Sequence, residues 1–281
     1  MPSLWLLAAI LGIVEGLTEF IPVSSSGHLI VVSDFLRFHE HLGSPDKVKV
    51  FVVVIQLGAI LAVGYYFRDK LWRAMTSRDV VSSDGRLRTN LAVAFIPAVI
   101  FGLFFDDFIT RHLFSTTTVA ISLILGGIGI IWIERKADKD KHIVPLEDMS
   151  VREALWVGLA QVASLMPGVS RSGATIMGGL LSGMTRTAAT EFSFLLSFPI
   201  MMAATGYTML KHWDLLESSM IGALAIGFVL SFFSALAVVA WLIRFVQKHS
   251  FVGFGVYRII FGAFLLILVA MGVLEQVPTA H

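Results

Sequence analysis

The chain has 281 residues, of which 56% are hydrophobic and only 15% are charged, and its formal net charge is +1. Soluble domains carry about 25% charged residues, so this deficit of charge indicates a surface that largely faces lipid. The near-neutral balance offers no basic stripe for nucleic acid, and the absence of cysteine excludes thiolate phosphatase chemistry and cysteine-ligated metals.

The first apolar segment, about 4–36, is broken at its centre by the sequence PVSSSGH at 22–28. Each half is too short to cross a bilayer, because a spanning helix needs ~20 apolar residues. Irregular backbone is tolerated at membrane depth only where protein or a water-filled cavity surrounds it. We therefore predict a re-entrant helical hairpin whose tip stops inside the bilayer.

Three spanning runs follow at about 48–67, 90–105 and 117–134, and Pro97 makes the ends of the second run the hardest to place. A second broken segment, 151–183, is interrupted by PGVSRSG at 167–173, which predicts a second hairpin. Three further spanning runs lie at about 189–210, 219–243 and 252–274. The predicted fold is thus an all-α polytopic membrane protein with six transmembrane helices and two re-entrant hairpins.

Basic residues are concentrated in the loops 68–89 and 135–152 and are sparse in 106–116 and 211–218. If neither hairpin crosses the membrane, the two basic loops lie on one side, which the positive-inside rule makes the cytoplasm. Both termini then lie outside. Three basic residues of a loop assigned to the outside do not follow this pattern, namely Arg37, Lys47 and Lys49.

Shifting the chain by 146 positions aligns the two hairpins without a gap, matching Gly12 to Gly158, Val23 to Val169, Ser24 to Ser170, Ser26 to Ser172 and Gly27 to Gly173. Each half contributes one hairpin and three crossings, an odd number, so the second copy is inverted. We expect a single membrane domain, 1–281, with repeats at about 1–134 and 151–275 and a cytoplasmic linker at about 135–150. Inverted repeats with broken helices place their site where the tips meet near the midplane.

Glu15 and Glu19 are four residues apart and so share one helical face. Two carboxylates inside a membrane repel each other and lose hydration, which a metal ion, Arg171 or a shared proton would relieve. A single glutamate that snorkels to the membrane surface would need no functional role. Two glutamates on one helical face, directly before a serine cluster, favour a functional role.

The second half of each hairpin begins at a serine-rich tip, where unpaired N–H groups and the helix dipole favour anions. We predict anion binding by these tips through Arg171, whose guanidinium matches phosphate, and through the serines Ser24, Ser25, Ser26, Ser170 and Ser172. Helix capping alone would need only one serine at each tip. His28, one turn after Ser25, is a candidate base, nucleophile or proton donor.

Arg258 and Glu191 lie within about two turns of predicted inner helix ends, where we expect them to snorkel. A transporter or flippase would share the membrane embedding, the repeats and the anion site. The glutamate, serine and histidine cluster favours an enzyme, since a carrier needs no nucleophile. Ser25, His28 and a metal-bound water remain alternative nucleophiles.

The segments EGLTEFIPVSSSGH at 15–28 and PGVSRSGAT at 167–175, with EFSFLL at 191–196, resemble the signature motifs of bacterial undecaprenyl-diphosphate phosphatases, also known as bacitracin-resistance proteins. The resemblance covers nearly the whole chain. It implies hydrolysis of the C55 lipid diphosphate to its monophosphate, which recycles the carrier for peptidoglycan synthesis. It also implies an inner-membrane enzyme with a divalent cation, Mg²⁺ or Ca²⁺, and a site open to the periplasm.

The resemblance further implies that Glu15 and Glu19 are the acidic pair, that Ser25 is the proposed nucleophile and that His28 is its catalytic companion. We expect the same two glutamates to hold the cation. The phosphate-binding positions would be Ser170, Arg171 and Thr175. The expected partners are a polyprenyl diphosphate and the lipid bilayer, with no nucleic acid and with homodimer formation left open.

Overall fold

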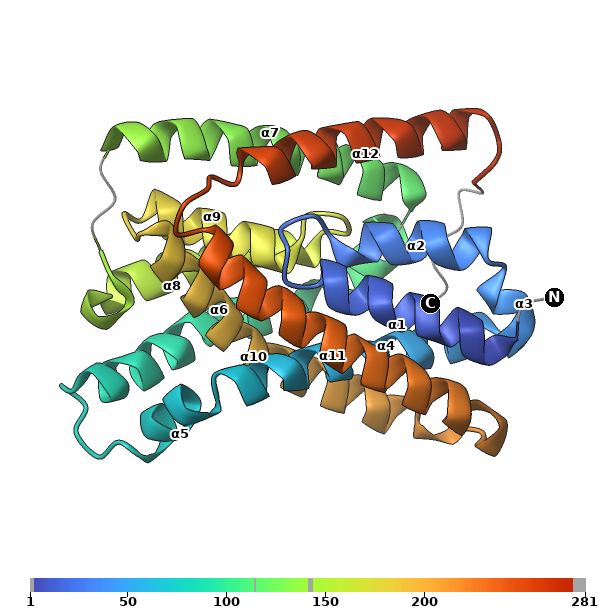
Figure 1. Ribbon diagram of the computed structural model, residues 1–281, viewed down its shortest axis with the longest axis horizontal. Helices are drawn as coiled ribbons and strands as arrows, with labels where there is room; N and C mark the ends of the chain where they lie inside the picture. The colour runs from blue at the N-terminus through green and yellow to red at the C-terminus, as the bar shows by residue number, and fades with distance from the viewer. Residues whose placement is uncertain (1–2, 114, 141–143, 275–281) are drawn as a thin grey trace.

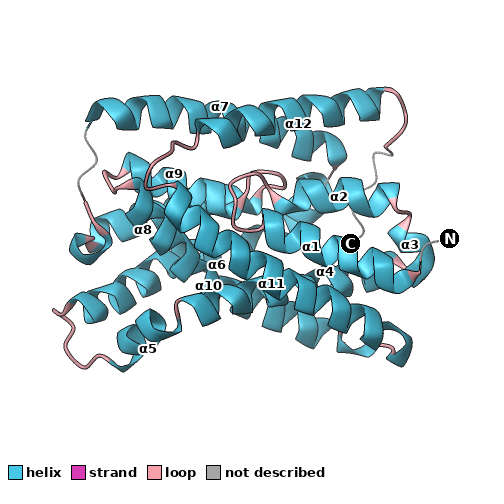
Figure 2. Ribbon diagram, viewed as in Figure 1, coloured by secondary structure: helices cyan, strands magenta, loops and turns pink. Residues whose placement is uncertain are grey.

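The computed structural model describes residues 3–113, 115–140 and 144–274. These residues are helical apart from turns and loops, and the described chain contains no β-strand (Figure 2). A parallel bridge joins Val144 to Met184. The predicted all-α class is therefore confirmed.

Six helices within the described residues are long and apolar enough to cross a membrane, and they match the six predicted runs. They are α4 (Pro45–Tyr66), α6 (Ser83–Leu113), α7 (Thr116–Asp140), α10 (Arg186–Lys211), α11 (Ile221–Phe245) and α12 (Val252–Ala270). Large apolar side chains on their outer faces are exposed, as Phe104 (79%) and Ile260 (64%) show. A soluble protein would bury such side chains, so these faces are suited to lipid.

The predicted loop 68–89 is partly helical. It contains the amphipathic helix α5 (Arg68–Thr76), and α6 begins at Ser83, before its apolar run. Pro97 is accommodated inside α6. Likewise, α7 continues to Asp140, so the expected linker 135–150 starts as helix, while its residues 141–143 lie outside the described residues. Lys141 of the basic loop 135–152 also lies outside the described residues. The side chains of Arg111 and Lys139 lie outside them as well.

The two broken segments form four short helices: α1 (Leu4–Thr18), α2 (Ser25–Phe35), α8 (Val151–Val162) and α9 (Arg171–Leu181). At 1.5 Å per residue they are about 16–22 Å long, well short of the ~30 Å hydrocarbon core. The remaining short elements are α3 (Phe38–Leu42) and the 3₁₀ turns Leu146–Asp148, Ala163–Leu165, Trp213–Leu215 and Ser218–Met220.

Glycine lets the first helix of each broken segment lie close to a spanning helix. A Cβ atom at Gly12 would come within 2.3 Å of the Gly227 carbonyl oxygen on α11. At Gly158 it would come within 2.6 Å of the Ala94 carbonyl oxygen on α6. These two glycines are a matched pair of the predicted repeat, and both allow backbone-to-backbone packing. The helices that carry the tips are therefore fixed to the spanning scaffold.

Candidate active site between the hairpin tips

The two broken segments meet at their tips. In Figure 1, α1 and α2 run inward from the end of the molecule where the N-terminus lies, α8 and α9 run inward from the opposite end, and the loops come together near the middle. The hydroxyl of Ser172 donates to the Ile21 carbonyl at 3.1 Å, and Arg171 Nη2 donates to Glu19 Oε1 at 2.9 Å. The predicted juxtaposition of the two serine-rich sequences is present.

The two tips share an unusual backbone conformation. Ser24 and Ser170, which precede α2 and α9, have φ angles of 69° and 71° and ψ angles of 99° and 116°. Residues other than glycine rarely adopt positive φ, and such strain is found where surrounding structure enforces it, often at functional sites. Ser170 Oγ caps α9 by accepting from the Gly173 N–H at 3.2 Å, whereas the Ser24 side chain makes no capping bond. Ser26 is half-buried in the first turn of α2.

The acidic pair is buried beside the first tip. Glu19 is 8% exposed and accepts hydrogen bonds on both oxygens, from Arg171 and from Ser25 Oγ at 2.6 Å. Glu15 is fully buried, and neither of its oxygens has a hydrogen-bond partner within the described part of the chain. A buried carboxylate without a partner is costly, so this position is completed by a proton or a cation.

This arrangement fits a divalent cation held by few protein ligands. No group of three or more His, Cys, Asp or Glu side chains gathers around a common point among the described residues. The available donors are the carboxylates of Glu15 and Glu19. Mg²⁺ is commonly bound through one or two carboxylates together with water and substrate phosphates. The donor set therefore suits a cation that binds together with a phosphate-bearing substrate.

Arg171 extends from the second tip toward the acidic pair. Besides Glu19, its guanidinium donates to the Ser193 carbonyl at 3.5 Å and lies 5.4 Å from the centre of the Phe20 ring. Its Nε is buried and has no partner within the described residues. An arginine with an unused donor at a site lined by helix N-termini is suited to a phosphate oxygen.

Thr175 lies deeper than the tip. Its hydroxyl contacts Ser193 Oγ at 2.6 Å and the Arg171 carbonyl at 2.9 Å, and the residue is fully buried. Thr175 thus joins α9 to α10 underneath Arg171. The hydroxyls of Ser170 and Ser172 lie 3.1 Å apart at the tip itself.

His28 does not contact Ser25 through a hydrogen bond, although the two residues are one helical turn apart. Its Nδ1 lies 2.8 Å from the Ser24 carbonyl, which can only accept, so Nδ1 carries the hydrogen. Its Nε2 then accepts from the Tyr257 hydroxyl at 2.6 Å, and Phe261 stacks on the ring at 4.4 Å. Ser25 instead donates to Glu19. The side chain that accepts the hydrogen bond of Ser25 is therefore Glu19, and not His28.

Two residues of α12 lie beside the site, a position that the sequence did not predict for either of them. Tyr257 contacts His28, and Arg258 is fully buried against the carbonyls of both tips. The prediction that Arg258 snorkels is wrong, because the face of α12 that carries it packs inward. Glu191 pairs with Lys70 at 2.8 Å near the start of α10. The sequence signal for Arg258 was an arginine within an apolar run. The direction in which such a side chain points, however, depends on how the helices pack.

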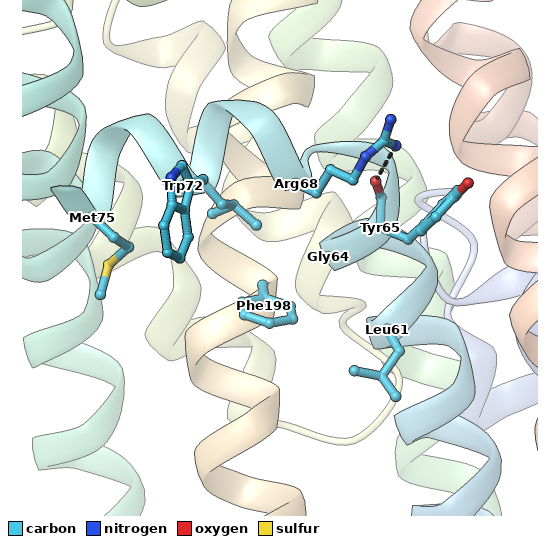
Figure 3. A pocket seen from close by; sticks show the side chains of 8 residues that line it. Leu61, Gly64, Tyr65, Arg68, Trp72, Met75 and Phe198 are labelled. Carbon is cyan, nitrogen blue, oxygen red and sulfur yellow. Dashed lines mark hydrogen bonds between the residues drawn. The ribbon is translucent and has the colours of Figure 1, made fainter. Parts of the chain in front are cut away.

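A shallow apolar pocket lies away from the tips, between α4, α5 and α10 (Figure 3). It is lined by Leu61, Gly64, Tyr65, Arg68, Leu71, Trp72, Met75 and Phe198. It shares no residue with the tips, and its lining contains no serine, histidine or carboxylate. The chemistry of this chain is therefore concentrated where the hairpins meet.

Comparison with known proteins identifies the family to which the chain belongs. The family model described as bacitracin resistance protein BacA matches residues 8–264. The undecaprenyl-diphosphatase of Nitrosospira multiformis is 50% identical over 269 residues, covering 95% of each chain. That of Laribacter hongkongensis is 48% identical over 265 residues, covering 93% of this chain and 95% of the relative. Undecaprenyl-diphosphatase 1 of Burkholderia thailandensis is 44% identical over 279 residues, covering 97% and 99%. The chain belongs to the BacA family of bacitracin resistance proteins.

Proposed function

We propose that this protein hydrolyses undecaprenyl diphosphate to undecaprenyl phosphate and inorganic phosphate, which recycles the lipid carrier for peptidoglycan synthesis and confers bacitracin resistance. The observation that carries the proposal is the contact of Ser25 Oγ with Glu19 at 2.6 Å, next to Arg171 and between two helix N-termini. A hydroxyl nucleophile, an adjacent base and an anion site are the parts that phosphoryl transfer needs. The names of the relatives support this substrate.

In the proposed reaction Ser25 attacks the terminal phosphorus. Its Oγ–H proton passes to Glu19 Oε2 as the new P–O bond forms, and the bond from phosphorus to the bridging oxygen breaks, releasing undecaprenyl phosphate. Water then attacks the phosphoserine and forms a new P–O bond as the bond between phosphorus and Ser25 Oγ breaks. Glu19 returns its proton to Ser25 Oγ, and the oxygen and both hydrogens of the water leave with the inorganic phosphate. His28 supports this geometry by holding the Ser24 carbonyl.

Phosphate binding is proposed for the tips and Arg171. Ser24, Ser26, Ser170 and Ser172 place hydroxyls and backbone N–H groups at the starts of α2 and α9, where the helix dipoles favour negative charge. Thr175 would act through Arg171, whose carbonyl it contacts.

A cation, Mg²⁺ or Ca²⁺, would be held by Glu15 and Glu19 and would neutralise charge on the diphosphate. The unpartnered oxygens of Glu15 support this assignment.

We further propose that the hairpins are re-entrant, that the chain is one membrane domain with inverted repeats 1–134 and 151–275, and that it lies in the bacterial inner membrane. Helices too short to span, tips with matching φ angles and hairpins running inward from opposite ends support this arrangement (Figure 1). Both termini and the site opening would face the periplasm. The homodimer that the sequence leaves open is tested by measuring the mass of the protein in detergent.

Topology can be tested by thiol labelling, because the native chain has no cysteine. We expect Ser3→Cys to react with a membrane-impermeant reagent in intact cells. Val81→Cys, at an exposed position before α6, should react only after lysis. Labelling of both from the same side would contradict the inverted repeat.

The function is tested by measuring inorganic phosphate released from undecaprenyl diphosphate by purified protein in detergent. We expect release that stops on chelation and returns with Mg²⁺ or Ca²⁺. A folded protein that releases no phosphate with any divalent cation would refute the proposed activity, and movement of the lipid without hydrolysis would favour a flippase.

A further inference from the structure

Arg258 is a fully buried arginine on α12, and its hydrogen bonds within the described residues all go to backbone carbonyls. Nη1 donates to Val169 at 2.9 Å and to Pro22 at 3.3 Å. Nη2 donates to Gly168 at 3.0 Å and to Ser122 at 3.2 Å, and Nε donates to Leu123 at 3.3 Å. Each of the three nitrogens therefore has at least one oxygen partner.

These carbonyls come from three different parts of the chain. Pro22 lies in the first tip, Gly168 and Val169 lie in the second, and Ser122 and Leu123 lie in the first third of α7. The neighbouring residue Tyr257 reaches the first tip as well, through His28 to the Ser24 carbonyl. Gly126 of α7 leaves room for the guanidinium, since a Cβ atom there would lie 2.2 Å from Arg258 Nη2. One side chain thus connects both tips to the α7 and α12 pair, which lies side by side in Figure 1.

No carboxylate lies within ion-pair distance of Arg258 in the described structure, so its charge is not neutralised by an acid. Burying a charge inside a membrane protein is costly unless hydrogen bonds compensate for the lost water. A purely structural contact could be made by neutral side chains at lower cost. The fork of five N–H donors, which lysine lacks, matches the several carbonyls that converge here.

The bonds to the second tip also fix the direction of its N–H groups. In a trans peptide the C=O and the following N–H point in opposite directions. When Arg258 holds the Val169 carbonyl, the Ser170 N–H is turned away from α12. Ser170 is also the residue with positive φ that starts α9 and precedes Arg171. By holding the Val169 carbonyl, Arg258 thus sets the direction in which the Ser170 N–H of this anion site points.

We propose that Arg258 is a positioning residue for phosphoryl transfer, which holds the two tips in register so that Ser25 and Glu19 of one tip face Arg171 of the other. The inference rests on the proposed phosphatase function. It assigns no contact between Arg258 and the substrate. Its effect is to keep the reacting groups of two separate hairpins at a fixed distance from each other.

The test compares purified Arg258→Lys and Arg258→Gln with wild type and with the control Arg244→Gln, which removes an exposed arginine from the last turn of α11. Three quantities are measured: the thermal midpoint in detergent, kcat and KM for undecaprenyl diphosphate, and the inhibition constant of inorganic phosphate. Misplacement of reacting groups by about 1 Å can cost about 10²-fold in rate. We expect kcat to fall by about that factor in Arg258→Gln, and phosphate inhibition to weaken. Arg258→Lys should recover part of both, and the control should match wild type.

A folded Arg258→Gln protein with wild-type kcat and wild-type phosphate inhibition would overturn the proposal. If neither Arg258 variant can be purified folded, the residue serves folding, and the positioning role is also overturned. An inactive wild-type protein would instead refute the proposed function, so the two failures are distinguished.

Discussion

The two hairpin tips have closely similar backbones but carry different chemistry. Ser24 and Ser170 are matched across the 146-residue shift and have nearly the same φ angle. At the following position, however, Ser25 of the first tip corresponds to Arg171 of the second. Three residues further on, His28 corresponds to Ala174, and before the tips Glu15 corresponds to Gln161.

In the proposed inverted repeat, the two hairpins would divide the parts of one reaction between them. Both copies supply a helix N-terminus, which favours an anion whatever the side chains are. The first copy adds the carboxylates and the hydroxyl, and the second adds the guanidinium. Neither tip holds all the parts, so the site exists only where the tips meet, at the contact between Glu19 and Arg171.

The largest effect is expected at the nucleophile. Ser25→Ala should lose nearly all phosphate release, at least about 10³-fold, because nucleophile and base act as a unit. Quenching the wild-type reaction in acid with labelled substrate should leave phosphoserine, which survives acid, whereas phosphohistidine does not. Substantial turnover by folded Ser25→Ala would return His28 or water to the role of nucleophile.

Arg171→Lys tests the cationic tip. It keeps the charge but loses the planar fork, so we expect kcat to fall by about 10²–10³-fold, the usual effect of removing a preorganised donor from a transition state. Arg152→Lys, at the exposed start of α8, is the matched control and should leave kcat unchanged. A near wild-type rate for Arg171→Lys would mean that Arg171 only pairs with Glu19.

Glu15→Gln gives the first hairpin the residue that the second hairpin has at the matching position, Gln161. The two side chains have nearly the same shape, so the change removes charge with little effect on packing. If Glu15 helps to hold the cation, the Mg²⁺ concentration giving half-maximal activity should rise by at least about tenfold. Titration of activity with Mg²⁺ measures this. The control is Gln161→Asn, which replaces one neutral amide with another at the matching position of the second hairpin. An unchanged Mg²⁺ titration would leave Glu15 binding a proton instead.

The smallest effect is expected for Tyr257→Phe, which removes the hydroxyl that donates to His28 but keeps the aromatic contact. A neutral hydrogen bond contributes about 1 kcal/mol, so kcat should fall by about fivefold. His28→Ala should cost more than this but much less than Ser25→Ala, because Glu19 rather than His28 takes the proton. Equal losses in His28→Ala and Ser25→Ala would make His28 the base.

The sequence by itself determined the membrane embedding, the six spanning helices and the positions of the two breaks. These features follow from local composition: ~20 apolar residues must form a helix in lipid, and a cluster of proline, glycine and serine interrupts one. The sequence also determined which residue types lie at the tips. Glu15 and Glu19 share a face because helical periodicity places residues four apart together.

Only the tertiary structure decided which of these residues contact one another. Sequence spacing placed His28 beside Ser25, yet Ser25 turns across the tip to Glu19, six residues earlier, while His28 turns to Tyr257, 229 residues later. The position of Arg258 in an apolar run did not reveal that its side chain is buried, since the direction of a side chain depends on how α12 packs against α7 and the tips. Helical periodicity is a property of the chain, but hydrogen bonds between helices depend on packing that residues far apart in the sequence create together.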